Sequence, residues 1–365
     1  MRVYEFVITG GPCAGKTTCL SVLDQNLKDK GFKVIVVPET ATEVISSGIG
    51  VTDIPRKDFQ SLILDRSLNK EETTRKAVEI MGQDTVILYD RGVLDSKAYM
   101  PKGEFSELLK ERGLSEVALR DNYDAVFHLV TAADGAEEFY TLSNNKARSE
   151  DPELARTLDI RTRNAWVGHP HLRVVDNSTS FKEKISRLCG EVSSAMGLPV
   201  PIEIERKYLI ERPGEEFLAG IGAVKQNILQ TYLSSDDPAV ERRIRQRGDG
   251  KDFSYYYTEK KYHSELGRIE TERKISEKEY LSLLLEGEKS VRKDRYCFIH
   301  KSQYFELDIY PQWQSKAILE IELTKENQKT VLPEWVSLIK EVTKSPKYKN
   351  SSLAGTIGLK REKEI

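Results

Sequence analysis

The spacing of apolar and polar positions changes near residue 200 of this 365-residue chain. Before that point, short apolar runs alternate with longer stretches of helical periodicity, which is typical of βαβ units around a parallel sheet. The expected strands are Val3–Thr9, Lys33–Pro38, Thr85–Tyr89, Ala125–Val130 and Leu172–Val175, and a long expected helix is Arg56–Met81. This part is therefore predicted to be an α/β domain with helices on both faces of its sheet.

After residue 201 the period shortens to two, as in Arg243–Ile244–Arg245 and Glu320–Ile321–Glu322. Successive side chains of a strand point to opposite faces, so each such strand has one charged and one apolar face. A single strand of this kind usually turns its charges to water. The whole series instead predicts an α+β domain with an antiparallel β-barrel, in which the charges line a wet tunnel and the apolar faces pack outward under helices. The capping box Ser276–Glu279 begins one such helix, and Pro333–Trp335 is a second candidate start.

The change of period coincides with a segment of small residues, glycine and two prolines, Ser193 to Pro201. Proline removes a backbone donor and ends helices, so this segment suits a linker. The predicted organisation is a nucleotide-binding domain over 1–192, a linker over 193–201 and a tunnel domain over 202–358.

Composition narrows the class of protein. A net charge of −2 argues against a nucleic-acid partner, because general nucleic-acid binders are usually basic. No apolar run is long enough to cross a membrane, and the beginning of the chain lacks a signal-peptide pattern. The four cysteines have no ligand spacing, which favours reduced thiols. We therefore expect a cytoplasmic protein; its oligomeric state is not predicted.

A Walker A loop follows the first expected strand and precedes a helix, which is the context that this motif requires. Its glycines let backbone N–H groups surround phosphate oxygens, so ATP is the expected ligand. Lys16 would bridge the β- and γ-phosphates, and the Thr17 hydroxyl would bind Mg²⁺. The expected nucleotide-binding residues of the loop are Gly10, Gly11, Pro12, Cys13, Ala14, Gly15, Lys16, Thr17 and Thr18.

Further polar residues follow the next two strands, at the sheet edge where ligands gather in such folds. Glu39 follows the second strand and Asp90 the third. Asp90 would support Mg²⁺, and either carboxylate would act as base toward an acceptor hydroxyl, unless it only caps the next helix. Of the arginines in a charged stretch beyond residue 145, Arg148 and Arg161 are the chosen lid residues; a solvated helix face is the alternative.

The motifs GGPCAGKTT, VVPET and YDRG, with the arginine lid, resemble the small-molecule kinase branch of P-loop proteins over about residues 1–190. This branch lies close to the AAA-like ATPase and kinase group that includes nicotinamide-riboside and nucleoside kinases. The apolar strand ending in Asp-Glu that a ring-forming motor needs is missing, so the resemblance implies an ATP-dependent kinase. The phosphoryl acceptor, a small molecule, stays unknown.

In the second half, acids and bases are predicted to share one lumen. Buried charges need partners or metals. Paired carboxylates suit Mg²⁺ or Mn²⁺, and arginines and lysines suit phosphate oxygens. A metal complex of a small-molecule triphosphate would satisfy both sets, which predicts metal-assisted hydrolysis.

The ordered motifs of residues 201–356 resemble the CYTH family, the triphosphate tunnel metalloenzymes, and among them the compact bacterial inorganic triphosphatases. The resemblance rests on EIERK at 203–207, LQTYL, ERRIR, the Lys260 strand, RIETE at 268–272, RKDRY, ELD, LEIEL and the closing EVTKSPKYKNSSLA.

The resemblance implies a role for each residue at a motif position. Metal ligands, or residues that support them, would be Glu203, Glu205, Glu270, Glu272, Glu306, Asp308, Glu320 and Glu322. Phosphates would be bound by Lys207, Arg243, Arg245, Lys260, Arg268 and Arg295. Lys293 and Tyr232 would assist water attack or protonate the leaving group.

Three other functions stay open at this stage. The same family includes class IV adenylate cyclases, although the contexts of Lys293 and Tyr232 favour a triphosphatase. The barrel could also sense polyphosphate or nucleotide and regulate the P-loop domain without hydrolysis. Processing of RNA 5′-triphosphates is disfavoured by the near-neutral charge. The sequence does not show whether the substrate of the tunnel is inorganic triphosphate, a nucleotide or thiamine triphosphate.

Overall fold

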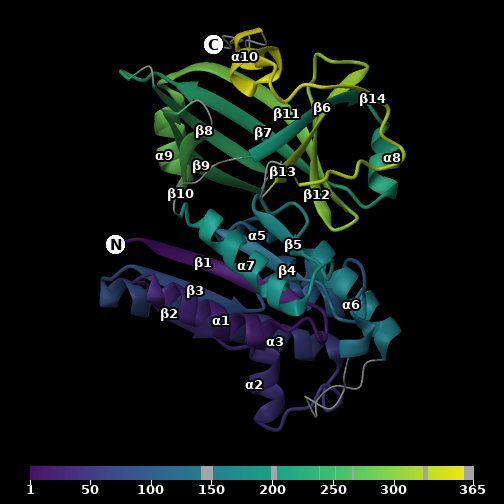
Figure 1. Ribbon diagram of the computed structural model, residues 1–365. Helices are drawn as coiled ribbons and strands as arrows, with labels where there is room; N and C mark the ends of the chain where they lie inside the picture. Colours follow the sequence, from purple (N-terminus) through teal and green to yellow (C-terminus); the bar gives the residue numbers. More distant parts are fainter. Residues whose placement is uncertain are drawn as a thin grey trace. The chain divides into compact units, whose positions relative to one another are not determined.

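The computed structural model describes residues 1–140, 151–198, 204–237, 239–250, 252–264, 267–323 and 328–356. It divides the chain into two compact units, Met1–Ala195 and Met196–Ile365, which we describe separately (Figure 1). Among the residues that it describes, no helix has the length and apolar character needed to span a bilayer.

The first unit is built on a five-stranded parallel sheet with the order β2-β3-β1-β4-β5. Its strands are β1 (Val3–Gly10), β2 (Lys33–Val37), β3 (Thr85–Asp90), β4 (Ala125–Leu129) and β5 (Leu172–Val175). The connecting helices are α1 (Lys16–Asp29), α2 (Thr40–Ser46), α3 (Arg56–Met81), α4 (Glu104–Glu111), α5 (Glu116–Arg120), α6 (Pro152–Ala165) and α7 (Phe181–Ala195), with 3₁₀ turns η1 (Val93–Tyr99) and η2 (Glu137–Phe139).

Burial on both faces explains the apolar runs of these strands. Phe6, Val7 and Ile8 of the central strand β1 are fully buried, as are all five residues of β4. In a parallel sheet covered by helices, both faces of a strand are buried. Its residues are therefore apolar in succession and do not alternate with polar ones. The predicted fold class, a P-loop-type α/β domain followed by an α+β domain with an antiparallel sheet, is confirmed.

The second unit is built on nine strands, in the order β10-β9-β8-β7-β11-β12-β13-β6-β14, with antiparallel ladders. The strands are β6 (Ile204–Glu211), β7 (Val224–Leu233), β8 (Val240–Asp249), β9 (Asp252–Ser264), β10 (Gly267–Ile275), β11 (Gly287–His300), β12 (Gln303–Ile309), β13 (Lys316–Leu323) and β14 (Leu338–Glu341). The shorter elements are α8 (Glu215–Gly220), α9 (Glu277–Leu284), η3 (Pro346–Tyr348) and α10 (Asn350–Thr356). The first strand, β6, therefore lies between two of the last, β13 and β14.

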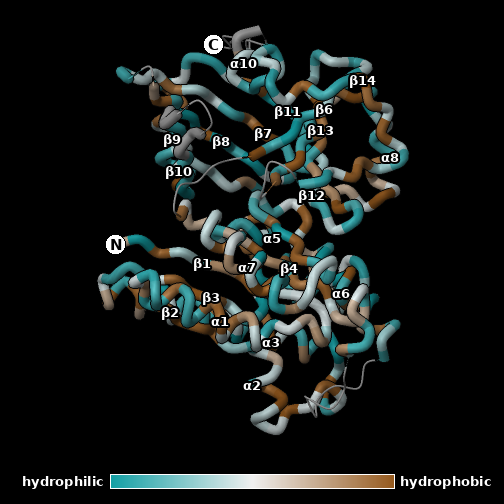
Figure 2. The backbone as a smooth tube through the Cα atoms, viewed as in Figure 1, coloured by the Kyte–Doolittle hydropathy of each residue, from teal (hydrophilic) through white to brown (hydrophobic). Residues whose placement is uncertain are grey.

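The two faces of this sheet differ in chemistry, as the alternation predicts. One face carries apolar side chains: Tyr208, Leu307, Leu319 and their neighbours form one cluster, and Ile244 packs with Tyr280 of α9 in another. Figure 2 shows the alternation as hydrophilic and hydrophobic segments that follow each other along the strands. We call the opposite face the charged face. Ser276 caps α9 as expected, because its hydroxyl accepts a hydrogen bond from the Glu279 N–H.

The second expected helix does not form. Residues 333–336 make a turn, in which the Val336 N–H donates to the Pro333 carbonyl, and the chain continues into β14. Trp335 packs against the apolar cluster of β11 and β12, through Phe298. The pattern of these residues also fits the beginning of a helix. Here a turn, not a helix, brings the indole of Trp335 against the apolar cluster.

Candidate active sites

The Walker A loop connects β1 to α1 in a conformation that its sequence makes possible. Gly10 and Gly15 have φ angles of 148° and 84°, and a Cβ on Gly10 would lie 2.2 Å from the Leu129 carbonyl oxygen. Only glycine fits these positions without strain. Helix α1 begins at Lys16 with no side-chain cap and no acidic residue in its first turn. Its free N–H groups and positive dipole end are therefore available to an anion.

A buried carboxylate holds the first part of this loop. Asp159 of α6 accepts hydrogen bonds from the N–H groups of Gly11 (2.8 Å) and Thr131 (3.0 Å). Its other oxygen lies 3.2 Å from the buried His128 imidazole. Burial raises the pKa of Asp159, but His128 and the two backbone donors outweigh it and leave the pKa below its ordinary value. Asp159 is thus a positioning residue for the loop.

Lys184 of α7 holds the other end of the loop. Its ammonium, almost fully buried, donates to the carbonyls of Val130 (2.7 Å) and Ala14 (3.4 Å) and to the Asn177 side chain (2.7 Å). Burial lowers the pKa of this lysine to about 8. Sequence reasoning missed both Asp159 and Lys184, because nothing in their local pattern distinguishes them from ordinary helix-face charges.

Lys16, Asp90 and Glu39 come together at the carboxyl edge of the sheet. The Lys16 side chain is 7% exposed, and burial, reinforced by the charge of Arg91, lowers its pKa. Burial raises the pKa of Asp90, whose Oδ1 atom is buried with no hydrogen-bond partner in the described part of the chain. A buried carboxylate oxygen without a partner beside a phosphate loop fits a hard cation such as Mg²⁺. Asp90 and the exposed Thr17 hydroxyl are the groups that would hold it.

Arg91 also belongs to this site, although it was not among the predicted site residues. It has a left-handed backbone (φ 70°), and its Nε atom donates to Glu39 Oε1 at 2.6 Å. Thr42 donates to the other oxygen of Glu39 at 2.9 Å. Burial raises the pKa of Glu39, but the charges of Arg91 and Lys16 outweigh it and hold the pKa at about 2. Glu39 is therefore ionised and paired, which suits the binding of a hydroxyl more than proton removal.

The Arg91–Glu39 pair leads to a pH-dependent prediction. Because the pKa of Glu39 is depressed from 4.5 to about 2 in the fold, its stabilisation is present above pH 4.5 and is lost as the pH falls toward 2. We expect Arg91→Met to be less stable than the wild type by roughly 3 kcal/mol near neutral pH, with the gap narrowing on acidification. Urea unfolding of both proteins across this range measures the gap.

Arg66→Met is the control, because Arg66 is exposed and its ion pair with Glu43 spans 4.0 Å. A gap between Arg91→Met and the wild type that stays constant with pH would contradict the pairing.

Of the two proposed lid arginines, Arg148 lies outside the described residues and Arg161 is exposed on α6. Arg163 of the same helix is partly buried, and its Nε atom has no hydrogen-bond partner among the described residues. Burial lowers the pKa of Arg163, while Asp159 opposes this change. Within the described part of α6, Arg163 is thus better placed than Arg161 to gain from an anionic ligand.

In the second unit, the charged face buries its cations. The β-ladders bring the predicted residues to this one face: Lys207 is opposite Glu320, Arg295 is opposite Asp308, and Tyr232 is opposite Arg243. Lys207, Arg243, Lys260, Lys293 and Arg295 are each at most 9% exposed. The sheet curves (Figure 1), and burial on both faces is what a strongly curved sheet allows.

Carboxylates dominate the charged face on β6, β12 and β13. Glu306 and Glu320 lie directly opposite each other, and so do Glu205 and Glu322. Such like-charged pairs are unfavourable unless a cation lies between them. Arg295 supplies one: it donates to Asp308 (2.6 and 2.7 Å) and Glu320 (2.8 Å) and pairs with Glu306.

Lys207 compensates the remaining part of this acidic region. Its ammonium lies 2.7 Å from Glu320 and 3.1 Å from Glu205. Burial raises the pKa of Glu320, but the charges of Lys207, Lys293 and Arg295 outweigh it and leave the pKa well below its ordinary value. Glu320 is therefore ionised, as a metal ligand must be.

Cations dominate the same face on β8 and β9. Arg243 donates to Glu270 at 2.9 Å, and Lys260 lies 2.8 Å from the other oxygen of Glu270. Arg245 lies 3.5 Å from Glu272, to which Thr258 also donates. Burial lowers the pKa of Arg245 more than Glu272 raises it. Glu270 and Glu272 of β10 are thus the ion-pair partners of the cations on β8 and β9.

Lys293 and Tyr232 lie on neighbouring strands, β11 and β7. Lys293 pairs with Asp308, and its ammonium is 5.9 Å from the centre of the Tyr310 ring and 3.4 Å from Asn350 of α10. Its pKa is lowered by burial and by the charge of Arg295. Burial raises the pKa of Tyr232 to about 12, and its hydroxyl oxygen accepts a hydrogen bond from Gln230. Tyr232 therefore keeps its proton at neutral pH.

Of the predicted residues of this unit, Glu203 and the side chain of Arg268 in β10 lie outside the described part of the chain. In the described part of the chain, no group of three acids, histidines or cysteines is arranged to hold a metal ion. Carboxylate oxygens of this face still suit Mg²⁺ or Mn²⁺ in kind.

One cation of the charged face was missing from the predicted set. Arg247 of β8 is 2% exposed and lies opposite Ile228, which is itself opposite Lys293. The alternation Arg243, Arg245, Arg247 already contained the signal, since all three share one face.

Together these features define a P-loop domain with a kinase-like site, followed by a separate domain built on an antiparallel sheet. Residues 5–184 match the family model described as an AAA domain. A curated relative is the thymidylate kinase of Exiguobacterium sp. (strain ATCC BAA-1283 / AT1b), 30% identical over 122 residues. That match covers 31% of this chain and 56% of the kinase, so the chain spans about half the length of this relative.

The solved structures that resemble the chain include the following three. The inorganic triphosphatase NE1496 is 29% identical, with a TM-score of 0.31, over 43% of this chain and 96% of its own. A second structure of NE1496, described as a hypothetical protein, is 30% identical, with a TM-score of 0.30, over 42% of this chain and 97% of its own. PH1012 from Pyrococcus horikoshii OT3 is 20% identical, with a TM-score of 0.26, over 34% of this chain and 81% of its own.

Proposed function

We propose that the second unit hydrolyses inorganic triphosphate or a related triphosphate, and that the P-loop unit transfers a phosphoryl group from ATP to a small molecule. One observation carries the first half of the proposal. On the charged face, carboxylates occupy β6, β12 and β13, while most cations occupy β8, β9 and β11, with Glu270 and Glu272 of β10 paired to them. A polyanion and a hard divalent cation together match this separation of charge.

In this proposal the phosphate chain lies against Arg243, Arg245 and Lys260, with Arg247 and Arg295 beside it. Their buried guanidinium and ammonium groups bind oxygens that gain charge as a terminal P–O–P bond breaks. A divalent metal on Glu205, Glu320 and Glu322 would neutralise phosphate charge and acidify a bound water. Water oxygen joins the terminal phosphorus, and pyrophosphate leaves. The Tyr232 hydroxyl, protonated at neutral pH, is suited to donate to the departing oxygen.

The kinase half of the proposal is supported by three features. The Walker A loop is preorganised, Asp90 keeps a buried oxygen without a described partner, and Arg91 and Glu39 form a charged pair next to Lys16. The similarity of part of this unit to a thymidylate kinase points the same way. The ionised Glu39–Arg91 pair offers both an acceptor and donors to a hydroxylated substrate.

A phosphate-release assay tests the hydrolase. Inorganic triphosphate is incubated with Mg²⁺ or Mn²⁺ and with four proteins: wild type, Glu320→Gln, Glu288→Gln and Lys16→Ala. Glu288 is exposed on β11, so its variant is a matched control for loss of one carboxylate. We expect orthophosphate from the wild type, the control and Lys16→Ala, and a decrease of about 100-fold or more for Glu320→Gln.

Full activity of Glu320→Gln would exclude the charged face as the site of hydrolysis. An equal loss of orthophosphate release in the Lys16→Ala protein would mean that the P-loop unit performs the hydrolysis. Tight binding of triphosphate by the wild type without phosphate release would replace hydrolysis by sensing, and cyclic AMP formed from ATP would identify a cyclase.

A further inference from the structure

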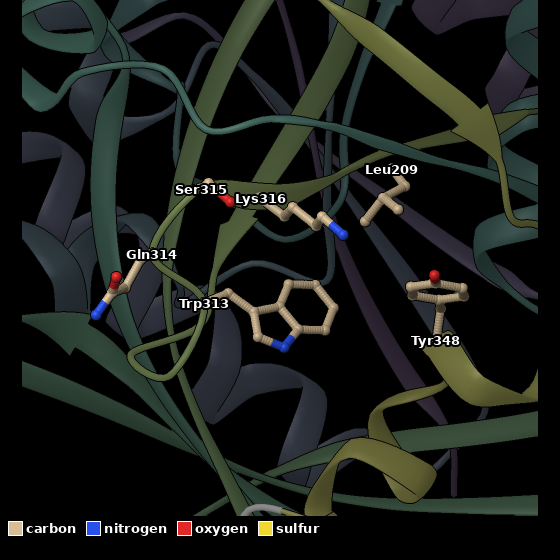
Figure 3. Close-up of a pocket in the computed structure, with 6 residues that line it drawn as sticks. All are labelled: Leu209, Trp313, Gln314, Ser315, Lys316 and Tyr348. Atoms are coloured by element: carbon tan, nitrogen blue, oxygen red, sulfur yellow. The ribbon is translucent and has the colours of Figure 1, made fainter.

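A pocket of about 360 Å³ opens beside the charged face, at the beginning of β13. It is lined by Leu209, Trp313, Gln314, Ser315, Lys316 and Tyr348 (Figure 3). Its volume lies within the range of about 300–1,000 Å³ that small-molecule sites occupy. None of these residues belongs to either site described above.

One side of this pocket is lined by the aromatic rings of Trp313 and Tyr348 and by Leu209. The half-buried Trp313 meets Tyr348 edge to face, with ring centres 6.2 Å apart, and Leu209 is buried beside them. Figure 3 shows the two rings and Leu209 around a common space. Aromatic side chains that line a cavity favour a planar ring, which stacks or packs edge-on against them. The shape therefore favours a planar aromatic ligand.

The charge of the pocket favours an anion. Lys316 is exposed and forms no hydrogen bond or ion pair with any residue that the structure describes. Figure 3 shows its side chain extending between Trp313 and Leu209. A second cation, Lys340, lies 5.3 Å from the centre of the Tyr348 ring. Glu211 is opposite Lys316 in the ladder, but no ion pair joins these two residues.

We propose that this pocket binds a nucleoside monophosphate, with the base against Trp313 and the phosphate at Lys316. The aromatic wall recognises the base, and the ammonium group recognises the phosphate. The exposed Ser315 hydroxyl offers a hydrogen bond to a ribose hydroxyl. A flat ring alone or a phosphate alone would engage only one part of this lining.

A short chain of contacts joins the pocket to Lys293. Trp313 packs on Tyr310 with ring centres 4.8 Å apart, and the Tyr310 hydroxyl donates to Asn350 at 2.8 Å. Both Tyr310 and Asn350 contact the Lys293 ammonium. A ligand that orders Trp313 therefore also orders the surroundings of Lys293. The effect of the nucleotide on hydrolysis rests on the proposed function, whereas its binding does not.

Binding is tested with a fluorescent derivative of AMP by anisotropy, on the full chain. Every protein carries Lys16→Ala to suppress binding at the P-loop. Trp313→Ala and Lys316→Gln are expected to weaken binding by about tenfold or more, and Trp313→Phe to retain most of it. Lys278→Gln is the control, because Lys278 is exposed on α9. Unlabelled AMP should compete better than adenosine or ribose 5-phosphate.

If Lys316→Gln and Trp313→Ala have the same dissociation constant as the control, the proposal is overturned. Equal competition by ribose 5-phosphate and AMP also overturns it, since the base would then not be recognised. Lys316 is exposed, so its variant tests the pocket even where Trp313→Ala fails to fold. AMP is further expected to change the rate of triphosphate hydrolysis in Lys278→Gln but not in Lys316→Gln. If AMP binds as expected but no variant releases orthophosphate from triphosphate, the proposed hydrolysis is refuted and the assignment of the pocket to a nucleoside monophosphate stands.

Discussion

Replacement of Arg295 by methionine is expected to lower the free energy of unfolding of the second unit by about 3–5 kcal/mol and to abolish triphosphate hydrolysis. Arg295 is the cation shared by Asp308, Glu320 and Glu306. Asp308 is fully buried, and without Arg295 its remaining cation is Lys293. Methionine keeps much of the side-chain volume but leaves buried carboxylates that must take up protons or recruit a cation.

Arg292→Met is the matched control, because Arg292 is exposed on the same strand, three residues away and on the opposite face. Urea unfolding and orthophosphate release measure both consequences. A stable and active Arg295→Met protein would mean that the charged face is solvated and that its acids do not depend on this guanidinium.

Lys16→Ala and Asp90→Asn are expected to reduce ATP turnover by about 100-fold or more and to leave triphosphate hydrolysis unchanged. Lys16 is a buried cation at the beginning of α1, where the phosphates of ATP would lie. Asp90→Asn keeps the size of the side chain and removes the negative charge that a divalent cation needs. ADP formation with a panel of nucleosides and nucleotides as acceptors measures the turnover.

Lys28→Ala on the same helix is the control, because Lys28 is exposed and pairs only with Asp24 among the described residues. Unchanged ADP formation by the Lys16→Ala protein would show that the loop does not position ATP for transfer. If Asp90→Asn alone remained active, Mg²⁺ would be held without this carboxylate.

Local patterns predicted most of the strands and which charged residues of the second sheet share a face. The central strands of the first sheet are apolar runs because both of their faces are buried, as Phe6 and Val126 show. In the second sheet a period of two was enough to place Lys293, Arg295 and Asp308 on one face, since alternation is a property of any strand.

Long-range contacts were not predictable in the same way. Asp159 is 148 residues from the Gly11 N–H that it holds, and Lys184 is 170 residues from Ala14. Arg91 looked like part of a strand-end motif, but its pairing with Glu39 depends on a left-handed backbone that sequence does not reveal. The Trp313 pocket arises where two turns meet, and neither turn carries a recognisable motif.

The position of β6 between β13 and β14 has a consequence for protein synthesis. The earliest strand of the second unit finds its hydrogen-bonding neighbours only after Leu323 and Glu341 have been made, more than a hundred residues later. While the ribosome translates the intervening strands, β6 has two open edges and unpaired charges. The sheet of this unit can therefore be completed only late in translation. In a nascent chain stalled before residue 316, the unpaired edges of β6 would be accessible to chaperones and proteases.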